Sequence, residues 1–282
     1  MSLLLCKKEA ETPFYSEKLD IRLWSMQELC YVIYNHPLLA AGDLAGEELC
    51  RWLREELAQG FLAARIEQIR AAAKAEDRDP SDEILMAILR DCNYYSPAEI
   101  DACQRRLSAY QNCPPEDRAH AEGVSLFKLR RYRMAEEHFR EEAELLSERA
   151  GKAQPGRERE AVQKRRANVC CDLAVIKARL FENEAARKLL SDADKLSESG
   201  RAARLRYYLR DAEDSAVSGD ADGLTDEERS ELDRRREEVR MHVLSGRRLK
   251  ELNAMFEQDP VKREAACAEQ LRKWKKEYRR MK

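Results

Sequence analysis

The sequence is poor in residues that break helices, and it lacks the common motifs of catalysis and phosphate binding. Only 10 of its 282 residues are glycine and 8 are proline, which disfavours a loop-rich fold. It contains no G-x-x-x-x-G-K-[ST], no G-x-G-x-x-G and no H-E-x-x-H segment, the patterns of P-loop, dinucleotide and zinc-protease sites. We therefore expect a protein that is not an enzyme, with no catalytic residues and no cofactor.

Long apolar runs and paired cysteine motifs are also missing. No stretch approaches the roughly 18 apolar residues that a membrane span requires, and the opening "MSLLLCKK" is too short for a secretory apolar core. The nine cysteines are odd in number and show no C-x-x-C spacing. These absences predict a soluble cytoplasmic protein with free thiols and no membrane association.

Charged residues are abundant, at 38% of the chain, yet the net charge is only −2. Opposite charges lie interspersed, as they do on solvated helix faces, and this balance argues against a globally basic nucleic-acid binder. The composition favours α-helices. Three S/T-x-x-E segments, Ser25–Glu28, Ser96–Glu99 and Thr225–Glu228, predict capping boxes that open helices.

Only the N-terminal region indicates β-structure. In "LDIRLW" (19–24), Leu19, Ile21 and Leu23 alternate with polar residues and Trp24, a period typical of a strand. We predict that this segment pairs with "SLLLC" (2–6) in a small ribbon within residues 2–24. A helix follows from Ser25, and Pro37 ends it.

The middle of the chain has a repeat-like pattern. Residues 121–146 place small, large, aromatic, small and aromatic positions in the order that two packed antiparallel helices require. Residues 170–196 repeat the order less well, because Lys177 occupies a large apolar position and the aromatic-to-alanine spacing has changed. The first set is Gly123, Leu126, Tyr132, Ala135 and Phe139; the second is Ala174, Phe181, Ala186 and Leu190.

These positions resemble the tetratricopeptide repeat over about residues 115–218, although Ala135 and Ala186 are 51 residues apart in place of about 34. The resemblance implies stacked helical hairpins. Separately, "LLLCKKEAETPFY" and "LWSMQELCYVIYNHPLL" resemble the start of an uncharacterised family of helical proteins from clostridial gut bacteria. That second resemblance implies no activity.

The sequence therefore predicts an all-α fold, an irregular right-handed solenoid of antiparallel helical hairpins. We divide it into an N-terminal helical region (1–112) with the possible ribbon, tetratricopeptide-like repeats (113–218) and long C-terminal helices (219–282). The last helix carries a heptad-like seam, which either caps the array or joins two copies as a homodimer. The seam residues are Cys267, Leu271, Trp274, Tyr278 and Met281.

We predict no metal site. Cys170 and Cys171 are adjacent and have no histidine nearby, and most cysteines lie on apolar stripes, where cysteine acts as a small hydrophobe. The histidines at 36, 120, 138 and 242 lie in separate elements. The segment 218–229 resembles a calcium loop, but Ser218 and Arg229 replace its first and last acidic ligands.

By analogy with stacked hairpins, we predict a scaffold or adaptor that binds a peptide or partner helix of another protein in a concave groove. The predicted groove-facing residues are Ser125, Lys128 and Arg131 in the first repeat, and Asp172, Val175 and Arg179 in the second.

The alternative is an RNA- or DNA-binding helical protein. Residues 261–282 carry nine Lys or Arg against three Glu, which suits contact with phosphates. In the sequence, however, Trp274 and Tyr278 belong to the apolar seam and do not alternate with the basic side chains as stacking platforms, so we favour the adaptor.

Overall fold

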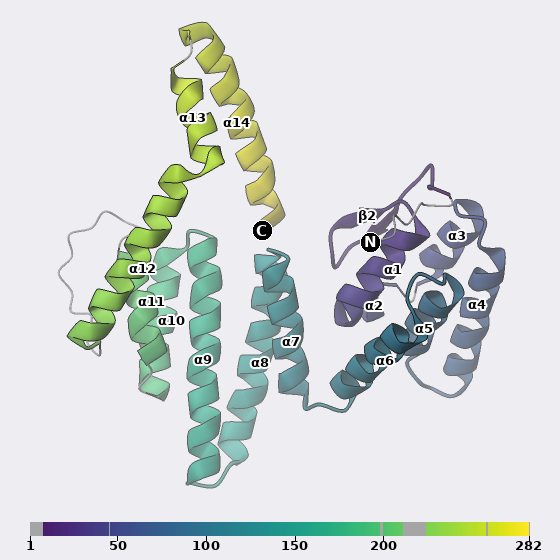
Figure 1. The fold of residues 1–282 in the computed structure, drawn as a ribbon. Helices are drawn as coiled ribbons and strands as arrows, with labels where there is room; N and C mark the ends of the chain where they lie inside the picture. Colours follow the sequence, from purple (N-terminus) through teal and green to yellow (C-terminus); the bar gives the residue numbers. More distant parts are fainter. Residues whose placement is uncertain (1–7, 45, 198–199, 211–223, 258, 282) are drawn as a thin grey trace. The chain divides into compact units, whose positions relative to one another are not determined.

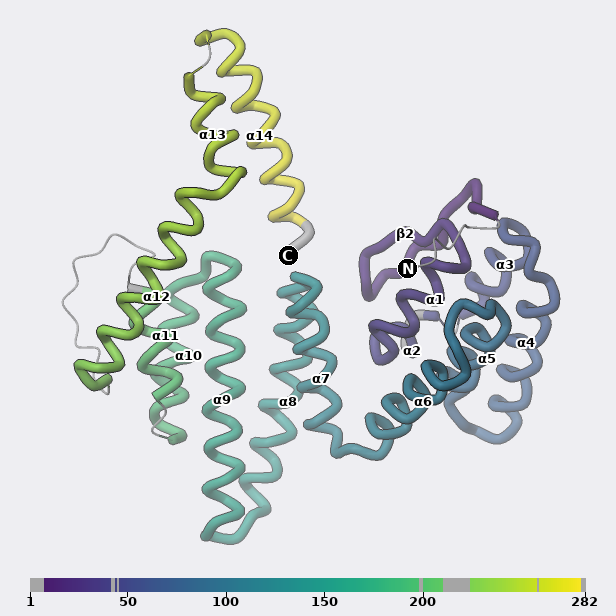
Figure 2. The backbone as a smooth tube through the Cα atoms, in the orientation of Figure 1, coloured from purple at the N-terminus to yellow at the C-terminus, as the bar shows by residue number. Residues whose placement is uncertain are grey.

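The computed structural model describes residues 8–44, 46–197, 200–210, 224–257 and 259–281 (Figures 1 and 2). Over these residues the chain consists of fourteen α-helices and one two-stranded sheet, which confirms the predicted all-α class. The chain divides into two compact units, residues 1–129 and 130–282. The three regions drawn from the sequence stay a prediction, because they follow composition and motifs.

The first unit contains the ribbon and seven helices. Helix α5 is its centre, because apolar side chains on all its faces are buried, and it packs against α1, α2, α4 and α6. The elements are β1 (Phe14–Ser16), β2 (Ile21–Leu23), α1 (Met26–Asn35), α2 (Pro37–Asp43), α3 (Glu47–Glu55), α4 (Gly60–Ala75), α5 (Ser81–Asp91), α6 (Pro97–Gln111) and α7 (Pro115–Lys128).

The ribbon exists, but its strand pairing differs from the expected one. Strand β2 forms where the alternation predicted it, and it pairs antiparallel with β1, with Phe14 opposite Leu23. β1 lies in the segment that was expected to form the connection, and residues 2–6 fall outside the described residues. Phe14 packs on Trp52, whose indole N–H donates to the Thr12 carbonyl at 2.9 Å. This anchor on α3 selects the strand, and period-two alternation cannot detect it.

The predicted helix starts are confirmed at all three capping sequences. The Ser25, Ser96 and Thr225 side chains each accept a hydrogen bond from the backbone N–H three residues later. Glu99 and Glu228 in turn accept a hydrogen bond from the backbone N–H of the cap residue, whereas Glu28 accepts from the Trp24 N–H. Pro37 ends α1 and also begins α2.

The second unit contains the remaining helices. Figure 1 shows α8, α9, α10 and α11 side by side with alternating directions, and neighbouring pairs are in contact, as is α9 with α11. The helices are α8 (Tyr132–Lys152), α9 (Arg157–Arg179), α10 (Asn183–Leu196), α11 (Gly200–Arg210), α12 (Asp226–Ser245), α13 (Arg247–Phe256) and α14 (Pro260–Met281).

Small residues allow α9, α10 and α11 to approach closely. Their shared core repeats at helical spacing and consists mostly of alanine, which brings the helix backbones together with little side-chain entropy lost. Its buried members are Ala167, Cys171, Ala174, Ala186, Leu190, Ala193, Ala202 and Leu209. Ala174, Ala186 and Leu190 thus take the buried positions that the repeat pattern assigned to them.

A buried ion-pair network links α8, α9 and α10, and it explains the lysine at an apolar repeat position. Both residues are buried: Lys177 is 9% exposed and Glu136 is 3% exposed. The Lys177 ammonium lies 2.8 Å from Glu136 Oε1 and 2.7 Å from Glu182 Oε2. Arg133 contacts both carboxylates as well. A charge at this depth is tolerated because it is multiply paired.

Further ion pairs hold the other helix interfaces of the second unit. Arg165 on α9 donates from Nε and Nη2 to Glu142 on α8, at 3.0 and 2.9 Å, and Glu142 is fully buried. Arg201 on α11 pairs with Asp172 on α9. Each interface therefore combines apolar packing with a polar contact that fixes its register.

Helices α12, α13 and α14 form the C-terminal part of this unit. Leu232 on α12 packs with Ala203 and Leu224, and the Tyr207 hydroxyl donates to Asp233. α13 contacts both α12 and α14, yet it buries no residue. Among the helices that the structure describes, none combines the length and apolarity needed to cross a bilayer.

The network around Lys177 predicts a non-additive mutational response. Glu136→Leu leaves the buried ammonium with one carboxylate fewer, and we expect it to lower the free energy of unfolding by about 3 kcal/mol. Adding Lys177→Met removes the stranded charge, so the double variant should be more stable than Glu136→Leu alone. Chemical denaturation of the two single variants and the double variant measures this. Strictly additive losses would contradict it. Glu231→Ala, at an exposed pair on α12, should change stability by less than about 1 kcal/mol.

The same network predicts acid sensitivity. Hydrogen bonds from Lys177 and Arg133 hold the pKa of Glu182 below its usual value, which is about 4.3. A depressed carboxylate pKa contributes stability above the unfolded-state pKa, and this contribution is lost as the pH falls through the folded-state pKa. We expect Glu182→Gln to be less stable than the wild type at pH 7 and to lose less stability between pH 5 and pH 3, measured by urea denaturation. The control Glu184→Gln, at an exposed neighbouring position, should follow the wild type; an unchanged acid slope in Glu182→Gln would contradict the prediction.

Candidate functional site

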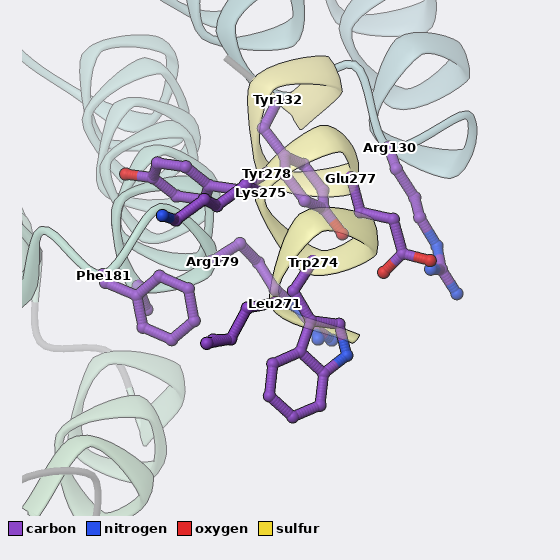
Figure 3. A pocket seen from close by; sticks show the side chains of 10 residues that line it. Arg130, Tyr132, Arg179, Phe181, Leu271, Trp274, Lys275, Glu277 and Tyr278 are labelled. Carbon is purple, nitrogen blue, oxygen red and sulfur yellow. The ribbon is translucent and has the colours of Figure 1, made fainter. Parts of the chain in front are cut away.

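The strongest candidate site is an apolar cavity of about 840 Å³ in the second unit. It lies between the corner that joins α9 to α10, the start of α8, and α14 (Figure 3). Its size falls within the range of about 300–1,000 Å³ that is usual for ligand pockets. The lining is mainly aromatic and aliphatic, with four charged side chains, and consists of Arg130, Tyr132, Ala178, Arg179, Phe181, Leu271, Trp274, Lys275, Glu277 and Tyr278.

Phe181 is placed in the cavity by the way α9 ends. Its backbone is left-handed, with φ of 62°. The N–H of Phe181 donates to Ala178 O, and that of Glu182 donates to Lys177 O at 2.9 Å. These two bonds make a Schellman motif, which normally has glycine at the left-handed position because a side chain there is strained. The chain nevertheless places a phenylalanine there, 78% exposed.

The exposure of Phe181 corrects the repeat assignment. The sequence pattern placed it at a packed aromatic position of the second repeat, equivalent to a buried position of the first. In the structure Leu180, one residue earlier, takes the buried place. The altered aromatic-to-alanine spacing and the left-handed turn account for the difference, because the turn directs residue 181 away from the α9–α10 core.

Helix α14 supplies the opposite wall through its heptad-like seam. Leu271 and Trp274 are 50% and 47% exposed, and the Tyr278 ring centroid lies 6.3 Å from that of Phe181. The seam therefore lines an open cavity and is only partly covered within the chain. The described part of the seam ends at Tyr278, since the Met281 side chain lies outside the described side chains.

A second cavity of about 310 Å³ continues the first along α9. Both are lined by Ala178, Arg179 and Phe181, and the second extends past Val175 to Leu205 and Tyr208 on α11. Together they form one apolar surface along the C-terminal half of α9, which we call the α9 groove. Among the described residues that line it, none is histidine, cysteine, serine or aspartate.

The structure brings two of the six predicted groove residues to this surface. Arg179 lines both cavities and Val175 lines the second. Asp172, one turn earlier on α9, pairs with Arg201. Arg131 is the N-cap residue of α8.

Ser125 and Lys128 belong to α7, in the first unit. The Ser125 hydroxyl donates to Ala121 O at 2.8 Å, while Lys128 is exposed. The prediction that these residues face a groove stays a prediction.

Sequence reasoning missed the contributions of Arg130, Phe181 and Lys275. Arg130 shares the left-handed conformation of Phe181, with φ of 61°, and each follows the end of a helix, α7 and α9. For Arg130 and Phe181 the sequence offered one weak signal, a large residue at a helix end where glycine is usual.

The cysteines behave as the apolar stripes predicted. Burial raises the pKa of Cys50, Cys103 and Cys170, and that of Cys171 to about 11, so these thiols stay protonated at neutral pH. The Cys30 and Cys92 thiols are hydrogen-bonded to each other, which raises the pKa of Cys30.

Among the described residues, no group of three or more His, Cys, Asp or Glu side chains is placed to hold a metal ion. The first half of the calcium-loop-like segment, residues 218–223, lies outside the described residues; Asp226 and Arg229 belong to α12.

Comparison of the chain with protein-family models, with curated proteins and with solved structures finds no match.

The strained backbone of Phe181 predicts that glycine at this position makes the fold more stable. Phe181→Gly relieves the left-handed strain and removes a side chain that is mostly exposed, so the free energy of unfolding should rise by about 0.5–1 kcal/mol. The matched control is Phe61→Gly. Phe61 is 97% exposed in the first turn of α4, and glycine there should lower stability by about 0.5–1 kcal/mol. Thermal and urea denaturation measure both, and a clear loss in Phe181→Gly would show that Phe181 supports the fold.

Proposed function

We propose that this chain is a non-enzymatic cytoplasmic adaptor that binds a peptide or helix of another protein in the α9 groove. The observation that carries the proposal is the cluster of large side chains left exposed there, Phe181, Leu271 and Trp274. Contiguous exposed apolar surface on a folded protein marks an interaction site. Aromatic residues in a concavity are the typical anchors of such interfaces.

The architecture supports the same proposal. We take α8 to α11 to be tetratricopeptide-like hairpins, supported by their alternating directions (Figure 1) and by the small buried residues where α9, α10 and α11 meet. Stacked hairpins expose a concave face that is suited to extended or helical peptides. The groove lining includes no serine, no cysteine and no metal-ligand cluster among the described residues, so its chemistry suits binding better than catalysis.

A second candidate function, binding of single-stranded nucleic acid, is favoured by one observation. Trp274 and Phe181 are exposed beside Lys275 and Arg179, and aromatic side chains next to cations can stack bases and contact phosphates. The sequence had suggested that Trp274 stands apart from the basic side chains, whereas both kinds of residue line the cavity. Leu271 in the same lining favours the adaptor, because leucine offers no stacking face.

Site-specific photocrosslinking in the native cell tests the adaptor. The photoreactive residue p-benzoylphenylalanine replaces Phe181 in one variant and Phe61 in another. Both positions are exposed, so the side chain is accommodated without repacking a core. We expect discrete protein adducts from position 181 and none of the same mass from position 61. Equal adduct patterns, or adducts at position 181 that nuclease rather than protease removes, would refute the proposal.

A further inference from the structure

We infer that the partner of the α9 groove is an acidic amphipathic helix, whose apolar face enters the cavity while its carboxylates meet the surrounding cations. This inference rests on the proposed adaptor function and specifies the chemistry of the partner. It follows from the charges at the cavity, from the spacing of its anchors on α14, and from the charge of the other apolar surface of the chain.

The cavity gathers cations that have no acidic partner within the described part of the chain. Arg130, Arg179 and Lys275 line it, and among the described residues none of the three forms an ion pair. Glu277 is the one carboxylate among the described residues that line it, so within this set three cations stand against one anion.

Four cations at the helix interfaces of this unit are paired. Arg133, Arg165, Lys177 and Arg201 each contact a carboxylate of a neighbouring helix or corner. The cavity differs from these interfaces, because none of its three cations forms an ion pair within the described part of the chain. The carboxylates of a partner can pair with these three cations.

The anchors of the cavity have the spacing of a helix-binding surface. Leu271, Trp274 and Tyr278 follow one another at i, i+3 and i+7 along α14, so they form a ridge of about 10 Å, or two helical turns. A partner helix presents its own apolar residues at the same intervals. Phe181 at the α9–α10 corner and Tyr132 at the start of α8 line the same cavity (Figure 3), so side chains that enter it meet aromatic residues from more than one element.

A second copy of this chain that docks through α12 and α13 fits the cavity poorly. One further group of exposed apolar residues lies on α12 and α13 and includes Val239, Val243 and Phe256. Residues 239–256 carry Arg240, Arg247, Arg248 and Lys250 against Glu251 alone. That surface would bring like charges to Arg130, Arg179 and Lys275, which disfavours the contact. We therefore take the partner to be a different protein, and the oligomeric state is measured in the test below.

Charge reversal with two synthetic helical peptides tests the inference. Each peptide has about 18 residues with Leu and Trp at i, i+3, i+4 and i+7, and its remaining face is Glu-rich in one and Lys-rich in the other. Fluorescence anisotropy measures their affinities for the full chain. We expect the acidic peptide to bind the wild type at least tenfold more tightly than the basic one. In Arg179→Glu/Lys275→Glu this preference should reverse.

The control, Arg248→Glu/Lys250→Glu, makes the same change of net charge at exposed positions on α13 and should keep the wild-type preference. Circular dichroism confirms that both double variants remain folded. Three results would overturn the inference: equal binding of the two peptides, an acidic preference that survives in Arg179→Glu/Lys275→Glu, or a concentration-dependent dimer in light scattering that blocks peptide binding.

A single-stranded RNA of about 12 nucleotides provides the remaining arm. RNA that binds more tightly than the acidic peptide, and that loses at least tenfold in affinity in Arg179→Glu/Lys275→Glu, would also overturn the inference and support the nucleic-acid alternative. If photocrosslinking at position 181 still captures a protein while the acidic peptide shows no preference, the inference fails and the adaptor function stands. If photocrosslinking from position 181 yields no protein adduct, the proposed adaptor function itself is refuted.

Discussion

The second unit depends on one constraint, the burial of the Lys177 ammonium near the end of α9. A charge taken out of water must find opposite charges at close range, or it destabilises the fold by several kcal/mol. Its two carboxylates come from different elements, Glu136 on α8 and Glu182 at the N-cap of α10. The pairing therefore fixes α8, the end of α9 and the start of α10 in one arrangement.

This constraint also determines what the groove presents. Between Lys177 and Glu182 the chain must reverse direction within a few residues while both side chains point inward to each other. The reversal uses the left-handed conformation of Phe181 and leaves Arg179 and Phe181 on the outer side. The residues that give the cavity its charge and its largest exposed ring are thus positioned by an ion pair that they do not touch. Rigid placement of this kind lowers the entropy that a binding surface loses when it meets its partner.

Local signals in the sequence were sufficient for much of the fold. Capping residues and apolar periodicity located helix starts and buried faces, because both depend on interactions within a few residues along the chain. Strand β2 followed from alternation in the same way. Its partner did not, since β1 is selected by Trp52, which is 38 residues beyond Phe14. Lys177 was noticed as an anomaly at an apolar position, but its explanation required Glu136 on another helix.

The candidate site was harder to foresee because periodicity identifies apolar residues without showing whether other parts of the chain cover them. Leu271, Trp274 and Tyr278 formed a recognisable seam, and Phe181 matched a repeat position. Only the spatial arrangement shows that these residues remain open to solvent around one cavity. Val175 and Arg179 were predicted to face a groove by analogy with stacked hairpins; both line the cavities, and their role in binding stays a prediction.

In the proposed adaptor, the apolar side chains and the cations of the cavity have different roles in binding the partner. Apolar burial supplies most of the affinity that a short helix can reach, but it discriminates weakly between partner helices that have similar apolar faces. The cations add little net affinity at an exposed rim, but they speed the encounter with an acidic partner and disfavour a basic one. With three unpaired cations, salt should weaken binding moderately, whereas a nucleic acid that follows the basic face of α14 would engage many more and show a far steeper salt dependence. An adaptor built on this groove would thus select its partner by charge and hold it by apolar contact. The buried ion pair beneath the groove keeps both sets of side chains in place.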